Sequence, residues 1–360
     1  MSSAGTVLRV GSVTANFQSE SPLHPAAQAF LADAFDRGWA DPAKVHQESR
    51  QANILLNEAK ETLAGHLGIR IDQVEFLADP SLGFHLGISG LLEAKSHLYY
   101  SSVARSEVFA VAGPSEFTKL PVQLDGSTDY PGGGEKDVLA WQSANGETGI
   151  ISKSPTEFRG KIFVDATASG ELVALPQRWS TALWNSKSWQ GPAGLGIFAI
   201  KDQSRWHNPL PHIDKKKISS EFSLPLALAS AIALEAHVSD YQKQLDYLRR
   251  QNLQIRSFLQ RELADVDIAG EIQDTLVHLL SFSILYTDAQ YLVSELDRRG
   301  FAVDSGSACS SANMEPSHVL AAMGILTHGN IRMNLQSSVE PSAVDEFLKV
   351  LQELVLEART

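Results

Sequence analysis

Residues 304–335 read DSGSACSSANMEPSHVLAAMGILTHGNIRMNL. They contain the only cysteine of the chain, Cys309, which lies between a run rich in Gly and Ser and a helix predicted from Pro316 to Met323. A strand-like segment that carries Arg332 follows. A lone thiol between a flexible run and a helix start is placed for chemistry rather than for packing, because a reactive thiolate needs exposure. The nearby cation suits a substrate that carries a carboxylate.

Predicted helices and strands alternate outward from this stretch, which indicates an α/β fold. The clearest strand is the β-branched run from Lys161 to Asp165. Apolar periodicity predicts helices from Pro225 to His237 and from Ser239 to Leu263. Asp41-Pro42 predicts the start of a helix that ends near Leu67. Further strands are predicted at 74–77, 97–101, 136–142, 278–285 and, joined by a glycine turn, within 179–200, and further helices before 92, at 290–298 and at the C-terminus.

The composition is that of an ordinary globular protein, with 43% hydrophobic and 20% charged residues. A length of 360 residues predicts one large and one small domain. We expect a large cofactor-binding domain over 12–240 and a smaller α+β domain formed by 1–11 and 241–360. The net charge of -12 argues against a nucleic-acid partner or an anionic membrane surface, because both favour clusters of Lys and Arg.

The single cysteine excludes an intrachain disulfide framework and a multi-cysteine metal site, and the sequence predicts no metal ligands. This cysteine usage fits a reducing compartment. The N-terminal residues lack the apolar core of a signal peptide. The most apolar stretch, Leu224 to Leu234, is half as long as the roughly 20 residues that a membrane span needs. We therefore expect a cytoplasmic protein without a membrane partner.

Polar side chains follow several predicted strands, where an open α/β sheet binds its ligands. They are Ser81, Asn145, Asp165 and the turn from Asn185 to Ser188. The turn before Ser81 leads into a helix N-terminus, where free backbone N–H groups attract phosphate. Asp165 suits a protonated ring nitrogen, and Lys187 suits a Schiff base with an aldehyde cofactor. Together these groups predict pyridoxal phosphate as the cofactor.

Taken one at a time, each candidate residue also has an ordinary structural explanation. A serine before a helix is a common cap, and an Asn-Gly pair or an Asp after a strand is a common turn former. A lysine or arginine usually lies at the surface, and a cysteine often packs as a small apolar residue. These alternatives apply to Ser81, Asp165, Asn145, Lys187, Cys309 and Arg332.

The ordered set of motifs resembles class V aminotransferase-fold proteins of the cysteine desulfurase type. The tightest match is SGSACSSANMEPSHVLAAMG with GNIRMNL, which follows the active-cysteine loop and the arginine strand of that family. Further matches, in the family's order, are ANFQSESPLHP, GWADPAKVHQESRQANILLNEAKE, QSANGETG, FVDATAS and WQGPAGLG. The resemblance covers about residues 10–340. It implies a homodimer of the aspartate aminotransferase-like fold, fold type I, with a mostly parallel central sheet.

The resemblance also implies an activity and roles for single residues. Cys309 would attack the sulfur of L-cysteine, or of a related amino acid, giving alanine and a persulfide for an acceptor protein, as in iron–sulfur cluster assembly. Arg332 and Asn145 would bind the substrate, with Arg332 holding its carboxylate. Asp165 would face the pyridine nitrogen, and Lys187 would hold the cofactor and move protons. Further cofactor contacts would come from Ser81 and Ser223 toward the phosphate and from Ser186, Ser188 and Arg105.

The cofactor region departs from the family pattern at several positions. The Schiff-base lysine of the family lies four residues before the proline of the glycine turn, which is Ser188 here, while Lys187 stands where a histidine is usual. Arg105 replaces the histidine that stacks on the cofactor ring, Ala168 replaces a glutamine, and Gly146 stands where many members have a second asparagine. Arginine cannot take over proton transfer, because it is effectively never deprotonated in proteins.

Different classes of function therefore stay open. In the first, Lys187 serves as the Schiff base through a one-residue bulge, and the chain is a pyridoxal-phosphate-dependent desulfurase-like enzyme. In the second, the chain is a degenerate class V homologue that binds a partner or carries persulfide without cofactor chemistry. A third hypothesis is another class V reaction, such as transamination or a different carbon–sulfur cleavage, which would not depend on Cys309.

Overall fold

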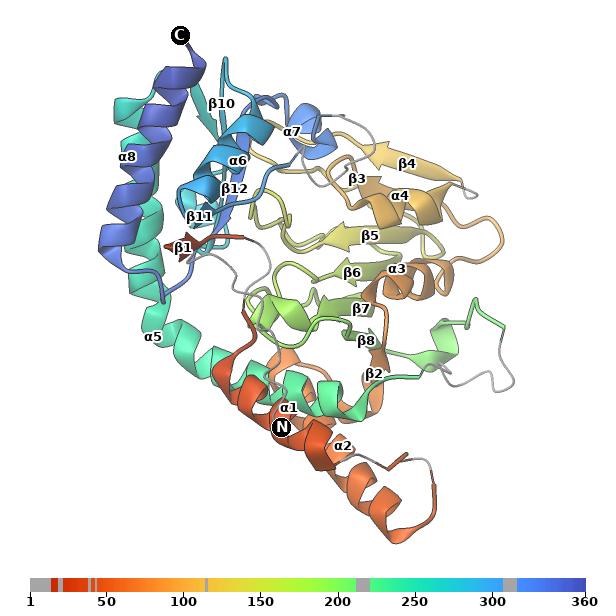
Figure 1. Ribbon diagram of the computed structural model, residues 1–360. Helices are drawn as coiled ribbons and strands as arrows, with labels where there is room; N and C mark the ends of the chain where they lie inside the picture. Colours follow the sequence, from red (N-terminus) through yellow and green to blue (C-terminus); the bar gives the residue numbers. More distant parts are fainter. Residues whose placement is uncertain are drawn as a thin grey trace, which may run out of the picture.

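A seven-stranded sheet crosses the structure, a computed structural model (Figure 1). Its strand order is β2-β8-β7-β6-β5-β3-β4. β8 runs antiparallel to both of its neighbours, and the other four adjacent pairs are parallel. This mostly parallel sheet confirms the predicted α/β fold class. The strands are β2 (Val74–Leu77), β3 (Leu98–Ser101), β4 (Phe117–Leu120), β5 (Val138–Gln142), β6 (Lys161–Asp165), β7 (Trp179–Asn185) and β8 (Gly196–Ile200). The structure describes residues 14–18, 22–37, 40–42, 44–113, 116–211, 221–306 and 316–360.

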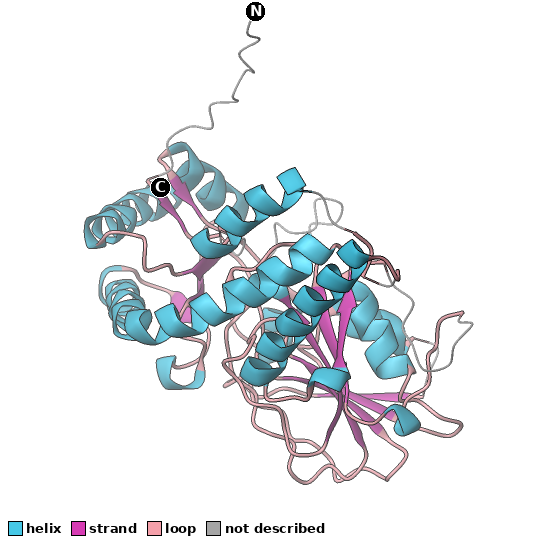
Figure 2. Ribbon diagram, turned by 90° about the horizontal axis from the view of Figure 1, so that it is seen from below, coloured by secondary structure: helices cyan, strands magenta, loops and turns pink. Residues whose placement is uncertain are grey.

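Helices pack on both faces of this sheet, and Figure 2 shows them flanking the strands. Ile162 and Val164 on β6 pack with residues of α1, α2 and α5, whereas Phe163 packs with residues of α3 and α4. Successive side chains of a strand point to opposite faces, so a strand that is buried on both faces reads as a continuous apolar run. The helices introduced here are α1 (Pro25–Arg37), α2 (Gln47–Leu67), α3 (Pro80–Ser89) and α4 (Ser106–Ala112).

A second hydrophobic core lies beside the large sheet, around an antiparallel sheet in the order β12-β10-β9. The short strand β1 pairs in parallel with β11, so the first described residues join the C-terminal part of the chain. The predicted domain limits at 12–240 and 241–360 stay a prediction. The elements of this region are β1 (Ala15–Asn16), β9 (Val266–Ile268), β10 (Leu279–Ile284), β11 (Phe301–Ala302), β12 (Asn330–Asn334), α6 (Ala289–Arg298), α7 (His318–Met323) and α8 (Pro341–Ala358).

One long helix, α5 (Leu224–Glu262), connects the two cores (Figure 1). The prediction of two helices that meet near His237 and Ser239 is wrong, because no Gly or Pro interrupts the segment there. Each half has its own packing partner, with Leu234 in the first core and Leu248 in the second. Although α5 has 39 residues, neither it nor any other helix in the described ranges is apolar enough to cross a membrane.

The start of α2 also differs from the prediction. The helix begins at Gln47, with His46 at the cap position, and not after Asp41-Pro42. An Asp-Pro pair starts turns as readily as helices, so the local signal was ambiguous. The predicted end at Leu67 is correct, because Gly68 takes a left-handed conformation with φ of 67° that glycine adopts without strain.

Candidate active site

The carboxyl ends of β3, β5, β6 and β7 meet at one edge of the large sheet. Asp165 at the end of β6 pairs with Gln142 on β5 and with Leu183 on β7. The loops that leave these strands, together with α5 and β12, enclose a cleft of about 820 Å³. Open α/β sheets bind their ligands at this edge. Seven of the residues singled out in the sequence line the cleft: Arg105, Gly146, Ala168, Asn185, Lys187, Ser188 and Arg332.

Asp165 lies beneath the cleft and is only 2% exposed. Its Oδ1 accepts hydrogen bonds from Thr167, from the backbone N–H at 3.0 Å and from Oγ1 at 2.6 Å. Its Oδ2 accepts from Gln142 Nε2 at 3.3 Å and lies 3.6 Å from Arg105 Nε. Both oxygens of this buried carboxyl group are thus matched by donors or by the neighbouring cation.

Two departures from the family pattern, Arg105 and Ala168, lie beside a third, Gly146. A Cβ atom added at Gly146 would lie 3.3 Å from Arg105 Nη2 and 3.4 Å from the Cβ of Ala168. The lack of a side chain at Gly146 therefore leaves room beside it for the guanidinium of Arg105. We call these three positions the packed unit around Arg105, because the guanidinium of Arg105 and the methyl group of Ala168 both lie beside Gly146.

Lys187 reaches the cleft from a short 3₁₀ helix, Ser186–Trp189, that follows β7. Asn185 caps this turn, because its Oδ1 accepts from the backbone N–H of Lys187 at 3.1 Å. Ser188 also lines the cleft, and its hydroxyl donates to the carbonyl of Asn185 at 2.7 Å. Ser186 is fully buried, and its hydroxyl donates to Ser230 on α5 at 2.7 Å. The one-residue offset therefore still leaves Lys187 on the wall of the cleft.

Arg332 reaches the cleft from β12, in the second core. Its Nη2 donates to the carbonyl of Ser305 at 3.1 Å, and its backbone pairs with Asp304. Gly306 is fixed in the same way, since its N–H donates to Asn330 Oδ1 at 2.8 Å. The segment that leads toward the cysteine loop is thus anchored on the arginine strand. Cys309 itself lies outside the described residues.

The structure does not bring the remaining predicted residues into the cleft lining. Asn145 is buried beside it, where its side-chain amide donates to the carbonyl of Val103 at 3.0 Å and accepts from the backbone of Thr148 at 3.0 Å. Ser81 lies at the start of α3, and Ser223 is half-buried at the cap position of α5 without a side-chain capping bond. Their proposed ligand contacts stay predictions.

Known proteins resemble this chain over nearly its whole length. The cysteine desulfurase IscS of Dictyoglomus turgidum is 26% identical over 370 residues, covering 94% of this chain and 92% of the relative. A cysteine desulfurase of Nostoc is 26% identical over 348 residues, covering 88% of this chain and 86% of that protein. A solved structure described as a NifS-like protein has a TM-score of 0.83 at 19% identity, covering 96% of this chain and all of that one, and shares the fold. No protein-family model matches the chain.

The chain is similar to cysteine desulfurases over most of its length and shares the fold of NifS-like proteins.

One wall of the cleft carries ionisable residues that the sequence reasoning missed. His237 and Tyr241 project from α5, and their rings lie 5.4 Å apart. Tyr241 packs edge-on against His278, with 6.1 Å between ring centroids. His237 Nε2 lies 3.4 Å from Oε1 of Glu171, whose side chain is only 8% exposed. Residues 237 and 241 are four apart on one helix face, and the break predicted at 238 concealed that spacing.

Burial controls the protonation of this wall. It raises the pKa of Glu171 to about 7 and lowers the pKa of His237 to about 4. The positive charge of His24 adds to the fall for His237, while Asp240 opposes it. Burial, with His237 adding to it, also lowers the pKa of His278 to about 4. Removal from water thus outweighs the attraction within the Glu171–His237 pair and favours the neutral form of each partner.

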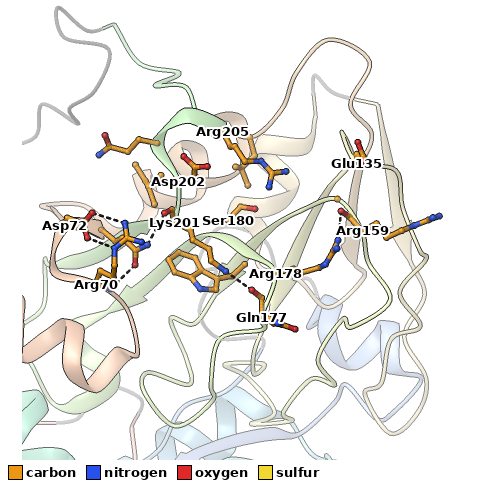
Figure 3. Close-up of a pocket in the computed structure, with 16 residues that line it drawn as sticks. Arg70, Asp72, Glu135, Arg159, Gln177, Arg178, Ser180, Lys201, Asp202 and Arg205 are labelled. Atoms are coloured by element: carbon orange, nitrogen blue, oxygen red, sulfur yellow. Dashed lines mark hydrogen bonds and ion pairs between the residues drawn. The ribbon is translucent and has the colours of Figure 1, made fainter.

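A larger cavity of about 1070 Å³ lies at the opposite, amino edge of the sheet, beside the first residues of β6 and β7 (Figure 3). We call it the amino-edge basin. Its charged groups have local partners: Arg70 Nε lies 2.8 Å from Asp72 Oδ1, and Lys201 Nζ donates to the carbonyl of Gln177 at 2.6 Å. None of the site residues predicted from the sequence lines this basin. The predicted site residues that line a cavity therefore lie in the smaller of the two.

Proposed function

We propose that this protein is a pyridoxal-phosphate-dependent cysteine desulfurase-like enzyme. It would take sulfur from L-cysteine, or from a related amino acid, release alanine and hold the sulfur as a persulfide on Cys309 for an acceptor protein. The observation that carries this proposal is the meeting of Lys187, Arg332 and the Asp165–Arg105 pair at one cleft. The names of the relatives, which are cysteine desulfurases, agree with it.

The residues at the lysine end of the cleft fit the cofactor. Lys187 Nζ is the amine that would hold the aldehyde, since its turn faces the cleft. Asp165 is a buried carboxyl group that would face a protonated ring nitrogen. When bound, pyridoxal phosphate supplies an electron sink for the substrate carbon atoms.

The residues of the chain would then divide the remaining tasks. The guanidinium of Arg332 would bind the substrate carboxylate through its two parallel N–H donors. Lys187 Nζ would accept and return protons in the cleft, because Arg105 stays protonated and cannot. The thiolate of Cys309 would attack the substrate sulfur. In the overall change the Cβ–S bond breaks and an S–S bond forms, while the bonding electron pair stays on carbon, which takes up a proton.

Spectroscopy and product analysis of the purified protein test this proposal. We expect absorbance in the visible range from the bound cofactor, a pyridoxyl label on Lys187 after borohydride reduction, and alanine release from L-cysteine. Lys187→Ala should lose the label, whereas Cys309→Ser should keep the label and lose the persulfide. Lys243 on the outer side of α5 provides a control, because its exposed amine pairs only with neighbouring helix residues. A label on another lysine, or no alanine from L-cysteine, would contradict the proposal.

The contact between Arg105, Gly146 and Ala168 favours a second candidate function. This packed unit replaces residues that serve the cofactor in relatives, so the chain could carry persulfide or bind a partner without cofactor chemistry. A colourless protein that accepts sulfur from a persulfide donor at Cys309 would support this second candidate. We also propose a homodimer, which the measured mass of the particle in solution tests.

A further inference from the structure

His237 and Glu171 form a buried pair between the long helix α5 and the loop that follows β6. His237 Nε2 lies 3.4 Å from Glu171 Oε1, and the two side chains are 14% and 8% exposed, respectively. Neither this nitrogen nor the carboxyl oxygens of Glu171 make a hydrogen bond to another of the described residues. Buried polar atoms are normally satisfied, so a buried imidazole–carboxyl pair of this kind calls for a functional explanation.

The pair lies on elements that contact the turn carrying Lys187. A Cβ atom at Gly170, the residue before the buried glutamate, would come within 2.8 Å of the hydroxyl oxygen of Ser188. The same turn is bound to α5 by the hydrogen bond from Ser186 to Ser230 at 2.7 Å. The histidine of the pair follows about two helical turns further along α5.

The wall that contains His237 continues to the strand of Arg332. Tyr241, about one helical turn beyond His237, packs against His278 with 6.1 Å between ring centroids. The carbonyl of His278 accepts the backbone N–H of Leu335 at 2.6 Å, on the segment that follows Arg332. All five of these residues line the cleft. His237 therefore belongs to a wall that reaches from the lysine turn to the arginine strand.

The proposed reaction needs a base that neither Lys187 nor Arg105 provides. The amino group of an amino acid is protonated at neutral pH, and it must lose a proton before its nitrogen can act as a nucleophile. While Lys187 holds the cofactor, its amine cannot take this proton, and Arg105 is never deprotonated. His237 is an uncharged imidazole on the cleft wall, because burial lowers its pKa to about 4.

Glu171 is the acidic member of the pair, and burial raises its pKa to about 7, so its carboxyl group takes up a proton near neutral pH. Burial and the charge of Glu171 raise the pKa of Tyr241 to about 12, so that tyrosine stays protonated. The other titratable groups around the pair come from four elements. They are His24 on the N-terminal segment, Asp240 on α5, which lies 3.4 Å from His24 Nε2, His278 before β10, and His66 at the end of α2, which shares a separate cavity of about 290 Å³ with Glu171.

We propose that His237 is a general base of the cleft and that Glu171 stores the proton that His237 removes. Nδ1 of the imidazole would accept a proton from the ammonium group of the substrate, while Nε2 would give its own proton to Oε1 of Glu171. The ammonium and the carboxylate thereby become an amine and a carboxylic acid, so both charges disappear from a region removed from water. The proton returns by the same path when alanine leaves as an ammonium ion. This inference rests on the proposed function of the cleft.

Alanine release from L-cysteine by the full-length protein with its cofactor tests this role. In the wild type kcat/KM should rise as the pH increases through about 7, because only the ionised Glu171 can store the proton. Glu171→Gln should lose this rise, and both Glu171→Gln and His237→Gln should lower kcat/KM at about pH 8 by about a hundredfold. Both variants should keep the pyridoxyl label on Lys187. The groups of the substrate titrate alike in every variant, so the comparison isolates the pair.

NMR of isotope-labelled glutamate carboxyl groups in the protein without ligand gives a second measurement. One signal should titrate near pH 7, and it should be missing in Glu171→Gln. His85 supplies the matched control, because it is a half-buried histidine on α3 whose Nδ1 lies 3.3 Å from Ser89 Oγ and which does not line the cleft. His85→Gln should leave both the pH profile of kcat/KM and this signal unchanged.

The outcomes separate this inference from the proposed function. Wild-type protein that releases alanine without a rise through pH 7, or a Glu171→Gln variant that keeps the rise and the rate, would keep the function and overturn the role of the pair. A Glu171 signal that titrates at the ordinary value of 4.5 would also overturn that role, whether or not alanine is released. No alanine from the wild type, with Glu171 titrating near 7, would overturn the proposed desulfuration and the base together.

Discussion

The cleft at the carboxyl edge and the amino-edge basin both gather arginine, lysine and carboxylate side chains, but they hold these charges differently. In the cleft the side chain of Asp165 is 3% exposed, and its partner Arg105 is 37% exposed. In the basin the paired side chains of Asp72 and Arg70 are 64% and 66% exposed. Water screens an exposed pair, whereas a charge removed from water depends on its protein partners. Of these two ion pairs, only the one in the smaller cavity includes a buried carboxyl group.

The strand directions account for the difference in position. Loops that follow the carboxyl ends of parallel strands converge from separate parts of the chain, so β3, β5, β6 and β7 each bring a residue or a turn to the cleft. The basin instead receives the beginnings of these strands and surface turns such as 201–205. Its polar groups interact mainly with near neighbours.

Matched removal of the two carboxylates should give the largest contrast. Asp165→Ala leaves the donors of Thr167 and Gln142 without their acceptor, and we expect it to lower the free energy of unfolding by about 3 kcal/mol. Asp72→Ala removes an exposed partner and should leave the denaturation midpoint unchanged. Chemical denaturation of both variants measures the difference. Equal effects would show that burial does not separate the two cavities.

Glu171, the buried partner of His237 on the missed wall, predicts a pH-dependent change in the free energy of unfolding. This change should be no larger than the effect of Asp165→Ala. The raised pKa of Glu171 means that the folded state binds this proton more tightly than the unfolded state, whose pKa is the ordinary 4.5. This stabilising contribution is full below pH 4.5 and is lost as the pH rises through about 7. Glu171→Gln should therefore be more stable than the wild type at pH 8, by up to about 3 kcal/mol, and similar to it at pH 4.5.

Denaturation curves at several pH values check this expectation. Glu353→Gln is the control, since Glu353 is a 60% exposed partner of Arg299 and should give no pH-dependent difference. A Glu171→Gln variant with the same pH dependence as the wild type would show that the buried carboxyl does not titrate in this range.

Substitutions in the packed unit around Arg105 should change the free energy of unfolding less than Glu171→Gln does at pH 8. Gly146→Ala places a methyl group 3.3 Å from Arg105 Nη2, which forces the end of a long side chain to shift and should lower the free energy of unfolding by about 1 kcal/mol. Arg105→Ala removes that crowding, so the two substitutions together should be less destabilising than the sum of their separate effects. A double-mutant cycle measures the coupling, and strict additivity would count against the packed unit.

The smallest expected effect lies in the basin. Arg178 is exposed, and its Nη1 donates to the carbonyl of Arg159 at 3.1 Å. Arg178→Ala should change the free energy of unfolding by less than about 0.5 kcal/mol and leave cofactor absorbance unchanged. A large loss in either measurement would give the basin a role that its geometry does not support.

The sequence predicted those parts of the fold that depend only on residues close to one another in the chain. β6 is found from Lys161 to Asp165, the limits that its β-branched run indicated, because burial on both faces leaves no polar alternation to confuse the pattern. The end of α2 near Leu67 was predicted correctly, and the structure supplies its local cause in the left-handed cap at Gly68. The continuity of α5 could not be read in this way, because it depends on two cores that lie far apart in the sequence.

The features of the candidate site also divide into those that the sequence determined and those that only the tertiary structure decided. The sequence by itself determined which chemical groups are available: one thiol, a lysine offset by one position, a strand-end carboxylate and an arginine on a late strand. Only the tertiary structure decided that Lys187 still lines the cleft, that Arg105 lies beside Gly146, and that Glu171 meets His237. These facts depend on strand register and burial, which join residues separated by tens of positions, whereas a sequence pattern reports mainly on near neighbours.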